Sequence, residues 1–244
     1  MGRIRVFAGP NGSGKSTLFQ QLQHTFNTGV FVNADIIEQQ ISRSGLIDLS
    51  AYGIKSSEEE FEQFKTSAEA ASLIKKAASE KLDIDLGLRE NFIVDKSKSS
   101  HSYESALAAL FIRHLLVAKN KTFSYETVMS HRSKITELLA ARASGYRNYL
   151  YFVCTDDPSV NIQRVENRVE KGGHDVLDDK ISSRYYKTLD NLFEVIKVCY
   201  RTYLFDNSGA TMILVGEIFA DKLTMYTSQV PNWVQQYVLK HFVQ

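Results

Sequence analysis

A nine-residue segment near the start of the chain constrains the fold more than any other feature. Residues 9–17 match every required position of G-x-x-x-x-G-K-[ST], the pattern of a phosphate-binding P-loop. Ile4, Val6, Phe7 and Ala8 before it are typical of a buried strand, and Leu18, Phe19 and Leu22 after it open an amphipathic helix. Strand, glycine-rich loop and helix in this order predict a P-loop fold that binds a nucleoside triphosphate.

The residue types of the loop suit phosphate chemistry. Glycines let the backbone turn tightly and bring its N–H groups close to phosphate oxygens. Lys15 is expected to bridge the β and γ phosphates, and the Ser16 hydroxyl to take one position on Mg²⁺. We therefore predict ATP or GTP with Mg²⁺ as the ligands. The predicted nucleotide-binding residues of the loop are Gly9, Pro10, Asn11, Gly12, Ser13, Gly14, Lys15, Ser16 and Thr17.

Composition and charge limit the kinds of partner and the location that we expect for the protein. The chain has 244 residues, of which 43% are apolar, enough to bury a large core. Its 29 basic and 28 acidic residues nearly cancel, so no overall field attracts nucleic acid or an anionic membrane. Cys154 and Cys199 lack metal-type spacing and are expected to be buried, reduced thiols. The chain enters its first strand at once and has no apolar run of membrane-spanning length, so we expect a cytoplasmic protein.

The next strand signal places an acidic residue where a substrate could meet the phosphates. Residues 29–32 form a compact apolar run, and Asp35 follows it closely. Ligands of parallel α/β sheets bind beside the carboxyl ends of the strands, which favours a catalytic Asp35. The alternative is that Asp35 caps the helix beginning at Ile36.

Residues 36–120 show no parallel strand and predict an inserted helical layer. Ser56-x-x-Glu59 has the form of a capping box, and apolar residues then recur at helical spacing to about Lys81. A second helix is predicted over about 103–118, and residues 82–100 indicate a short hairpin or a loop. The histidines at positions 101, 114 and 131 have no metal-ligand spacing.

The second half of the chain alternates strands and helices. Strands are predicted over 122–126, 149–154, 204–206 and 212–215, and a final helix begins at Pro231 and reaches Phe242. The helix after residue 126 is expected to start at Ser130 or Ser133. Asp157 and Pro158 start the helix that carries two arginines, and a glycine pair typical of a mobile lid follows it. We predict a single α/β domain over 1–244, a three-layer P-loop NTPase fold with a mostly parallel sheet, the insertion at about 36–120 and an arginine-bearing lid at about 164–180.

The order of these pieces resembles the zeta toxin-like P-loop kinases over about residues 3–209. The resemblance lies in the P-loop, Asn33-Ala34-Asp35, Phe123-Ser124-Tyr125-Glu126-Thr127, Gly145-Tyr146, Asn161-Ile162-Gln163-Arg164-Val165 with Arg168, Gly172-Gly173-His174, Arg184-Tyr185 and Asp206-Asn207-Ser208. It implies an ATP- or GTP-dependent kinase that phosphorylates a hydroxyl of a small metabolite, such as a UDP-N-acetyl sugar. An antitoxin protein is an implied partner.

The resemblance also implies roles for single residues. Asp35 would accept the proton of the attacking hydroxyl, Lys15 would bind the transferred phosphate, and Glu126 would lie near the metal and the substrate. Arg164 would be a lid arginine, while Arg168, His174 and Arg184 compete for the role of second lid cation. Glu126 is followed by Thr127-Val128-Met129 in place of a glycine-threonine turn, which puts the amino-sugar pocket in doubt. The implied catalytic residues are Asp35, Lys15, Arg164, Arg168 and His174; the implied substrate-binding residues are Asp35, Glu126, Thr127 and Arg184; the implied metal ligands are Ser16 and Glu126.

Several alternatives stay open at this point. Arg164 and Arg168 could form a solvated basic helix face paired with Glu166 and Glu170. Asn207 could contact the nucleotide base or form an Asx turn. The chain could also be a nucleotide-dependent ATPase or switch that signals to a protein partner, with Asp156 as a candidate Mg²⁺ ligand.

Overall fold

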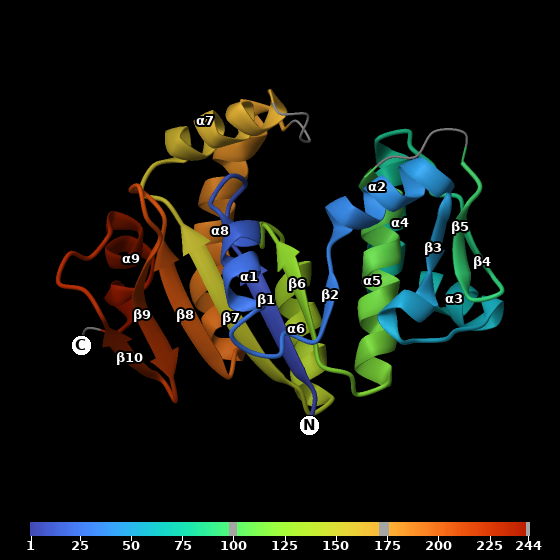
Figure 1. Cartoon of the computed structure of the whole chain (residues 1–244), viewed down its shortest axis with the longest axis horizontal. Helices are drawn as coiled ribbons and strands as arrows, with labels where there is room; N and C mark the ends of the chain where they lie inside the picture. Colours follow the sequence, from blue (N-terminus) through green and yellow to red (C-terminus); the bar gives the residue numbers. More distant parts are fainter. Residues whose placement is uncertain (98–101, 171–175, 243–244) are drawn as a thin grey trace. The chain divides into compact units, whose positions relative to one another are not determined.

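A computed structural model describes residues 1–97, 102–170 and 176–242 of the chain (Figure 1). Its contacts divide the chain into two compact units. The first unit comprises Met1–Thr28 and Ser124–Gln244, and the second comprises Gly29–Phe123. The second unit contains the segment of about 36–120 for which an insertion was predicted.

The first unit is built around a mixed sheet. Its strands lie in the order β10-β9-β8-β7-β1-β6. β1 pairs with β7 and β7 with β8 in parallel, whereas β8, β9 and β10 pair antiparallel at one edge. The mostly parallel sheet predicted from the sequence is confirmed, and the edge strand β10 is an addition. The bounds are β1 Arg3–Ala8, β6 Phe123–Thr127, β7 Arg147–Cys154, β8 Arg201–Asp206, β9 Ile213–Phe219 and β10 Lys222–Met225.

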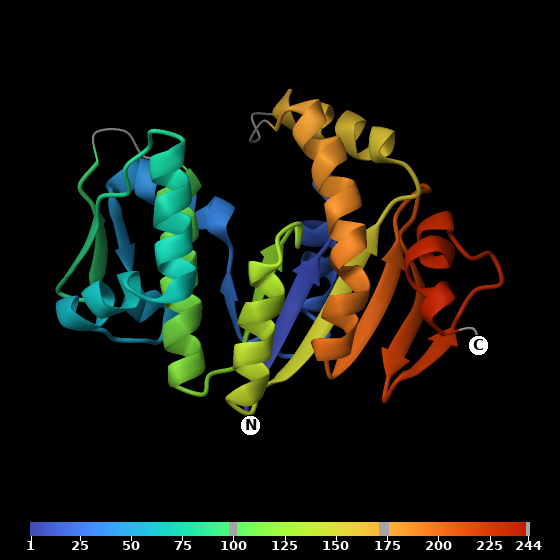
Figure 2. The same cartoon turned by 180° about the vertical axis from the view of Figure 1, so that it is seen from behind.

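Helices lie on both faces of this sheet, as Figures 1 and 2 show from opposite sides. Phe7 of β1 packs edge-on against Phe19 of α1, with ring centroids 5.2 Å apart. Phe152 of β7 packs against Trp233 of α9 at 5.6 Å, on the face that also carries α6 and α8. Apolar burial on both faces gives the predicted three layers. The bounds are α1 Lys15–Leu22, α6 Ser133–Ala143, α7 Pro158–Val169, α8 Asp178–Val198, α9 Asn232–Tyr237 and the 3-10 turn η2 Leu239–His241.

The second unit combines helices with a small antiparallel sheet of order β3-β5-β4. The hairpin of β4 and β5 confirms one of the two forms predicted for residues 82–100. Phe61 of α3 and Phe111 of α5 meet in the core with ring centroids 4.7 Å apart. The bounds are β2 Val30–Val32, α2 Ala34–Ser44, β3 Leu46–Asp48, η1 Leu49–Tyr52, α3 Glu58–Lys65, α4 Ala68–Ser79, β4 Leu86–Arg89, β5 Phe92–Asp95 and α5 Ser102–Ala118.

Three local predictions were wrong. The helix expected from the capping box to Lys81 is two helices: α3 ends at Lys65 with Thr66 as its C-cap, and the Ser67 side chain caps α4 by accepting the Ala70 N–H. Ser57, not Ser56, caps α3, since its Oγ accepts the Glu60 N–H at 3.2 Å. The final helix ends at Tyr237 and gives way to the 3-10 turn before Phe242. None of the helices in the described ranges is long and apolar enough to cross a membrane.

Candidate active site

The P-loop joins β1 to α1 in the conformation that its glycines allow. Gly12 and Gly14 have φ values of 71° and 103°, in the left-handed region that favours glycine. Gly14 is the N-cap of α1, and no side chain caps that helix. The positive end of α1 is therefore open toward the loop, which suits an anion. Lys15 Nζ donates to the Pro10 carbonyl at 2.8 Å, so the ammonium lies over the loop.

The loop is held against the chain on the β6 side as well. The Gly9 N–H donates to the carbonyl of Thr127, the last residue of β6, at 3.3 Å. Ser16 Oγ donates to Glu126 Oε2 at 2.8 Å. The two residues predicted as metal ligands are thus brought together by β6 and α1, which belong to the same unit.

This pair of oxygens fits Mg²⁺. Mg²⁺ prefers hard oxygen ligands and usually binds through one or two protein groups, with water and substrate phosphates completing its shell. Within the described ranges, no group of three or more His, Cys, Asp or Glu side chains forms a metal cluster. Ser16 and Glu126 would hold the metal, which supplies positive charge beside the phosphates when bound.

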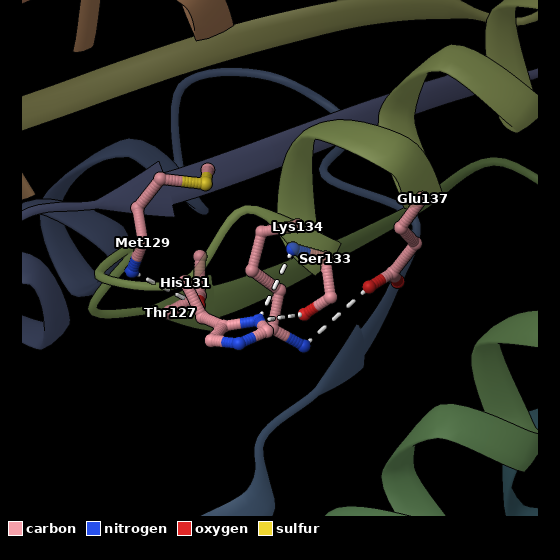
Figure 3. Close-up of polar contacts among 6 residues, drawn as sticks. All are labelled: Thr127, Met129, His131, Ser133, Lys134 and Glu137. Carbon is pink, nitrogen blue, oxygen red and sulfur yellow. Dashed lines mark hydrogen bonds and ion pairs between the residues drawn. The ribbon is translucent and has the colours of Figure 1, made fainter. Parts of the chain in front are cut away.

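The turn between β6 and α6 is unusual in backbone and hydrogen bonding (Figure 3). Met129 is buried at a φ of 62°, and its N–H donates to Thr127 Oγ1 at 3.3 Å. Thr188 and Asn191 of α8 bind the carbonyls of Val128 and Met129 at 2.7 and 3.1 Å. Two α8 side chains therefore stabilise a backbone conformation that a methionine rarely adopts.

The start of α6 continues this turn in Figure 3. His131 Nδ1 accepts the Ser133 N–H at 3.2 Å and lies 2.8 Å from Ser133 Oγ. A backbone N–H can only donate, so the neutral ring carries its proton on Nε2. Lys134 pairs with Glu137 at 3.5 Å, one turn further along the helix. His131 thus orders the helix start, and α6 begins at the second of the two predicted serines.

A buried asparagine of α7 holds the opposite side of the P-loop. Asn161 is fully buried; its Nδ2 donates to the Asn11 carbonyl, and its Oδ1 accepts from Thr155 Oγ1. Tyr185 of α8 donates its hydroxyl to the Thr155 carbonyl at 2.6 Å. Burial raises the pKa of Tyr185 and keeps that donor protonated. This role of Asn161 was not predicted from the sequence, where the residue stood out only as part of a motif.

The helix that carries Asn161 also carries the two predicted lid arginines. Asp157 caps α7 as predicted, with its Oδ1 accepting the Ser159 N–H at 2.7 Å. Arg164 lies one turn after Asn161 and is half-buried. Its Nη1 is inaccessible to solvent and has no hydrogen-bond partner among the described residues. The paired basic face considered as an alternative therefore does not describe Arg164.

The other predicted lid cations have different environments. Arg168 is exposed one turn further along α7, and Arg184 is half-buried on α8. His174, together with Gly172 and Gly173, lies outside the described residues. The choice of the second lid cation stays a prediction.

Asp35 belongs to the second unit, in the first turn of α2. Asn33 caps that helix, and its Oδ1 accepts the N–H groups of Asp35 and Ile36 at 2.8 and 3.3 Å. The capping role considered for Asp35 is thus performed by Asn33. The Asp35 residue is exposed and acts in α2 only as an acidic group near the positive helix end.

Asn207 contacts the P-loop itself. Its Nδ2 donates to the Ser13 carbonyl at 2.8 Å. The Asx turn at this point is formed by Asp206, whose Oδ2 accepts the Ser208 N–H at 3.1 Å. Asp156, the metal ligand considered for a switch, accepts the Trp233 N–H at 3.2 Å through Oδ1.

These features define a P-loop fold in which β6 places an acidic residue beside Ser16 and α7 places a buried asparagine against the loop. No model of a known protein family matches the chain. A protein of Haemophilus influenzae with the name "Uncharacterized protein" is 26% identical over 77 residues, which cover 32% of this chain and 55% of that protein. At this coverage the relative does not establish a family.

Solved structures share the fold more widely. AvrRxo1-ORF1:AvrRxo1-ORF2 with sulphate ions matches at a TM-score of 0.57 and 13% identity, over 94% of this chain and 62% of that one. AvrRxo1-ORF1:-ORF2 with ATP matches at 0.55 and 13%, over 93% and 61%. The PezAT toxin-antitoxin system of Streptococcus pneumoniae matches at 0.50 and 12%, over 100% and 81%. The chain thus spans about three fifths of the matched chain in the AvrRxo1-ORF1:AvrRxo1-ORF2 structure, and the fold expected from the resemblance to zeta toxin-like kinases is confirmed.

Proposed function

We propose that this chain is an ATP- or GTP-dependent kinase that transfers the γ-phosphoryl group to a hydroxyl of a small metabolite. Phosphoryl transfer needs positioning and neutralisation of charge more than covalent chemistry from the protein. The P-loop, the Ser16 and Glu126 oxygens and Arg164 would supply these needs, and all of them belong to one unit.

Arg164 is the observation that carries the proposal. A guanidinium nitrogen that is buried without a hydrogen bond costs free energy, about 1–3 kcal/mol or more for a charged group. Asn161, one turn earlier, fixes the helix to the loop at Asn11. On nucleotide binding the Arg164 side chain would turn toward the P-loop, where a phosphate oxygen would give it the charged acceptor that Nη1 lacks among the described residues.

The other predicted site residues would have the following roles in binding and transfer. Lys15 would leave the Pro10 carbonyl for the β and γ phosphates, and Ser16 with Glu126 would hold Mg²⁺. Asp35 would accept the proton of the attacking hydroxyl. Two observations support this assignment: Asp35 is exposed, and α2 is capped by Asn33 and not by Asp35. Arg168, His174 or Arg184 would supply the second lid cation, and Thr127 would contact the acceptor.

A steady-state assay tests the proposal. Purified protein with Mg-ATP should release ADP much faster when the correct acceptor is present, with UDP-N-acetyl sugars first in the screen. Arg164→Ala is expected to lower acceptor-dependent turnover about a thousandfold, in the range of other arginines that neutralise transferring phosphates. Arg132→Ala, which changes an exposed arginine at the start of α6, is the matched control.

Asp35→Asn separates binding from transfer. It should leave nucleotide affinity close to that of the wild type and stop acceptor-dependent ADP release. Ordinary turnover in this variant would remove Asp35 from the role of base. Hydrolysis at one rate with and without every acceptor would instead favour an ATPase or switch.

A protein partner is part of the proposal. One matched structure is a complex of AvrRxo1-ORF1 with AvrRxo1-ORF2, and another is from the PezAT toxin-antitoxin system. We propose that this chain also binds an antitoxin. Coexpression with the product of a neighbouring gene should then yield a stable complex with a lower kinase rate, and unchanged elution and rate would contradict the partnership.

A further inference from the structure

A buried hydrogen-bond network connects the last helix of the first unit to the turn after β8. Asp206, the final residue of β8, is 8% exposed, and its Oδ1 accepts from Trp233 Nε1 at 2.9 Å and from Ser208 Oγ at 2.8 Å. Trp233 is 2% exposed and packs against Phe152. The indole therefore binds Asp206 through a buried hydrogen bond.

Asn207, the next residue of the turn, connects this network to the P-loop. The backbone of Asn207 is fixed to β7, because its N–H donates to the Cys154 carbonyl at 2.8 Å. Its Nδ2 binds the Ser13 carbonyl and lies 2.5 Å from the point where a Cβ on Gly14 would stand. The Asn207 side chain thus packs on the loop just before Lys15.

A second set of bonds closes the network. The Trp233 N–H donates to Asp156 Oδ1, and the Asp156 N–H donates to Ser208 Oγ at 2.9 Å. Trp233 therefore contacts the segment after β7 through its backbone N–H and the end of β8 through its indole. Loss of the indole N–H would leave one oxygen of a buried carboxylate with a single donor, Ser208.

We infer that Trp233 is a positioning residue for the nucleotide site: its indole fixes Asp206, and Asp206 orients the turn whose Asn207 supports the P-loop. The inference rests on the proposed nucleotide binding and adds the C-terminal helix α9 to that site. It also explains the use of a tryptophan where a phenylalanine would fill similar space, because only the indole donates.

A double-mutant cycle tests the connection through Mg-ATP affinity measured by calorimetry. Trp233→Phe keeps an aromatic ring beside Phe152 but removes the donor, and should raise Kd about three- to tenfold, as expected for a network residue outside the ligand contacts. Asn207→Ala should raise Kd by at least as much. The double variant should bind like Asn207→Ala alone, since both changes act through one path. Tyr237→Phe, which removes a hydroxyl elsewhere on α9, is the control and should bind like the wild type.

The outcomes separate this inference from the proposed function. Wild-type affinity in Trp233→Phe, or multiplicative losses in the double variant, would overturn the role of Trp233 and leave the proposed function intact. Absence of Mg-ATP binding by the wild type would overturn both.

The fluorescence of Trp233 gives a second test that needs no change at that residue. It is the single tryptophan of the chain, so its emission reports this network alone. Mg-ATP should change the emission in the wild type, and the change should be lost in Asn207→Ala at saturating nucleotide. An equal change in both proteins would overturn the connection through Asn207.

Discussion

Gly12 allows the P-loop geometry to be tested by one methyl group. The residue has a φ of 71°, and a Cβ there would lie 2.5 Å from the carbonyl oxygen of Asn161. Gly145 offers a matched control, because it has a φ of 85° and, apart from its own chain neighbours, no residue has a heavy atom within 4 Å of the point where its Cβ would stand. Alanine at either site would be strained by the left-handed backbone. At position 12 its Cβ would in addition clash with the backbone of α7.

The magnitude follows from these two contributions. Left-handed backbone strain costs about 1–2 kcal/mol for a residue with a Cβ, and this applies to both variants. Relief of the contact at position 12 must move the loop away from α7 and break the bond of Asn161 to Asn11, which adds about 1–2 kcal/mol. Gly12→Ala should therefore lose about 2–4 kcal/mol of unfolding free energy, and Gly145→Ala about half as much.

Urea unfolding followed by Trp233 fluorescence measures this difference. Trp233, Gly12 and Gly145 all belong to the first unit, so the single tryptophan reports the unit that both changes affect. Gly12→Ala should also lose Mg-ATP affinity, whereas Gly145→Ala should retain it. Equal losses of stability, together with equal affinities, would refute the close approach of α7 to the loop.

Three further predictions concern the metal pair, a buried amide and a thiol. Ser16→Ala should lower turnover about a hundredfold or more and weaken the response to Mg²⁺ in an ADP-release assay, because a metal ligand is lost; an unaltered Mg²⁺ titration would contradict it. Asn148→Ala should lower the unfolding free energy by about 2 kcal/mol in urea, since the buried Nδ2 donates to the carbonyls of Leu138 and Val198 at 2.8 and 3.3 Å; a loss below about 0.5 kcal/mol would show that water replaces these bonds. Burial raises the pKa of the Cys154 thiol, so Ellman's reagent at pH 8 should modify Cys154 only on unfolding. As the pH rises above the ordinary value of 9.0 the unfolded chain releases this proton first, and stability should fall; fast labelling of native Cys154 would contradict its burial.

The features that could be predicted are those determined by residues close together in the sequence. The P-loop, the cap at Asp157 and the proline that follows it are local patterns, and each lies where it was expected. The break between α3 and α4 was also readable, because Ser67 is a favoured N-cap residue. β10 was missed since its turn, at Ala220 and Asp221, has positive φ values without the usual Asn or Gly.

The supports of the loop could not be predicted in this way. Asn161 binds Asn11 across 150 positions, and Asn207 binds Ser13 across 194. Both asparagines belong to motifs of the resemblance, but nothing in the immediate sequence indicates that their side chains bind the P-loop. Trp233 offered a weak signal, as a large aromatic residue with one donor that burial obliges it to satisfy.

The central claim is transfer of a phosphoryl group to a metabolite hydroxyl. Mass spectrometry of candidate acceptors after incubation with Mg-ATP tests it most directly, with Arg164→Ala and Asp35→Asn run beside the wild type. We predict that one acceptor gains the mass of a single phosphoryl group in the wild-type reaction and that neither variant forms this product at a comparable rate. Accumulation of ADP and free phosphate, with every acceptor in the screen unmodified, would contradict the claim.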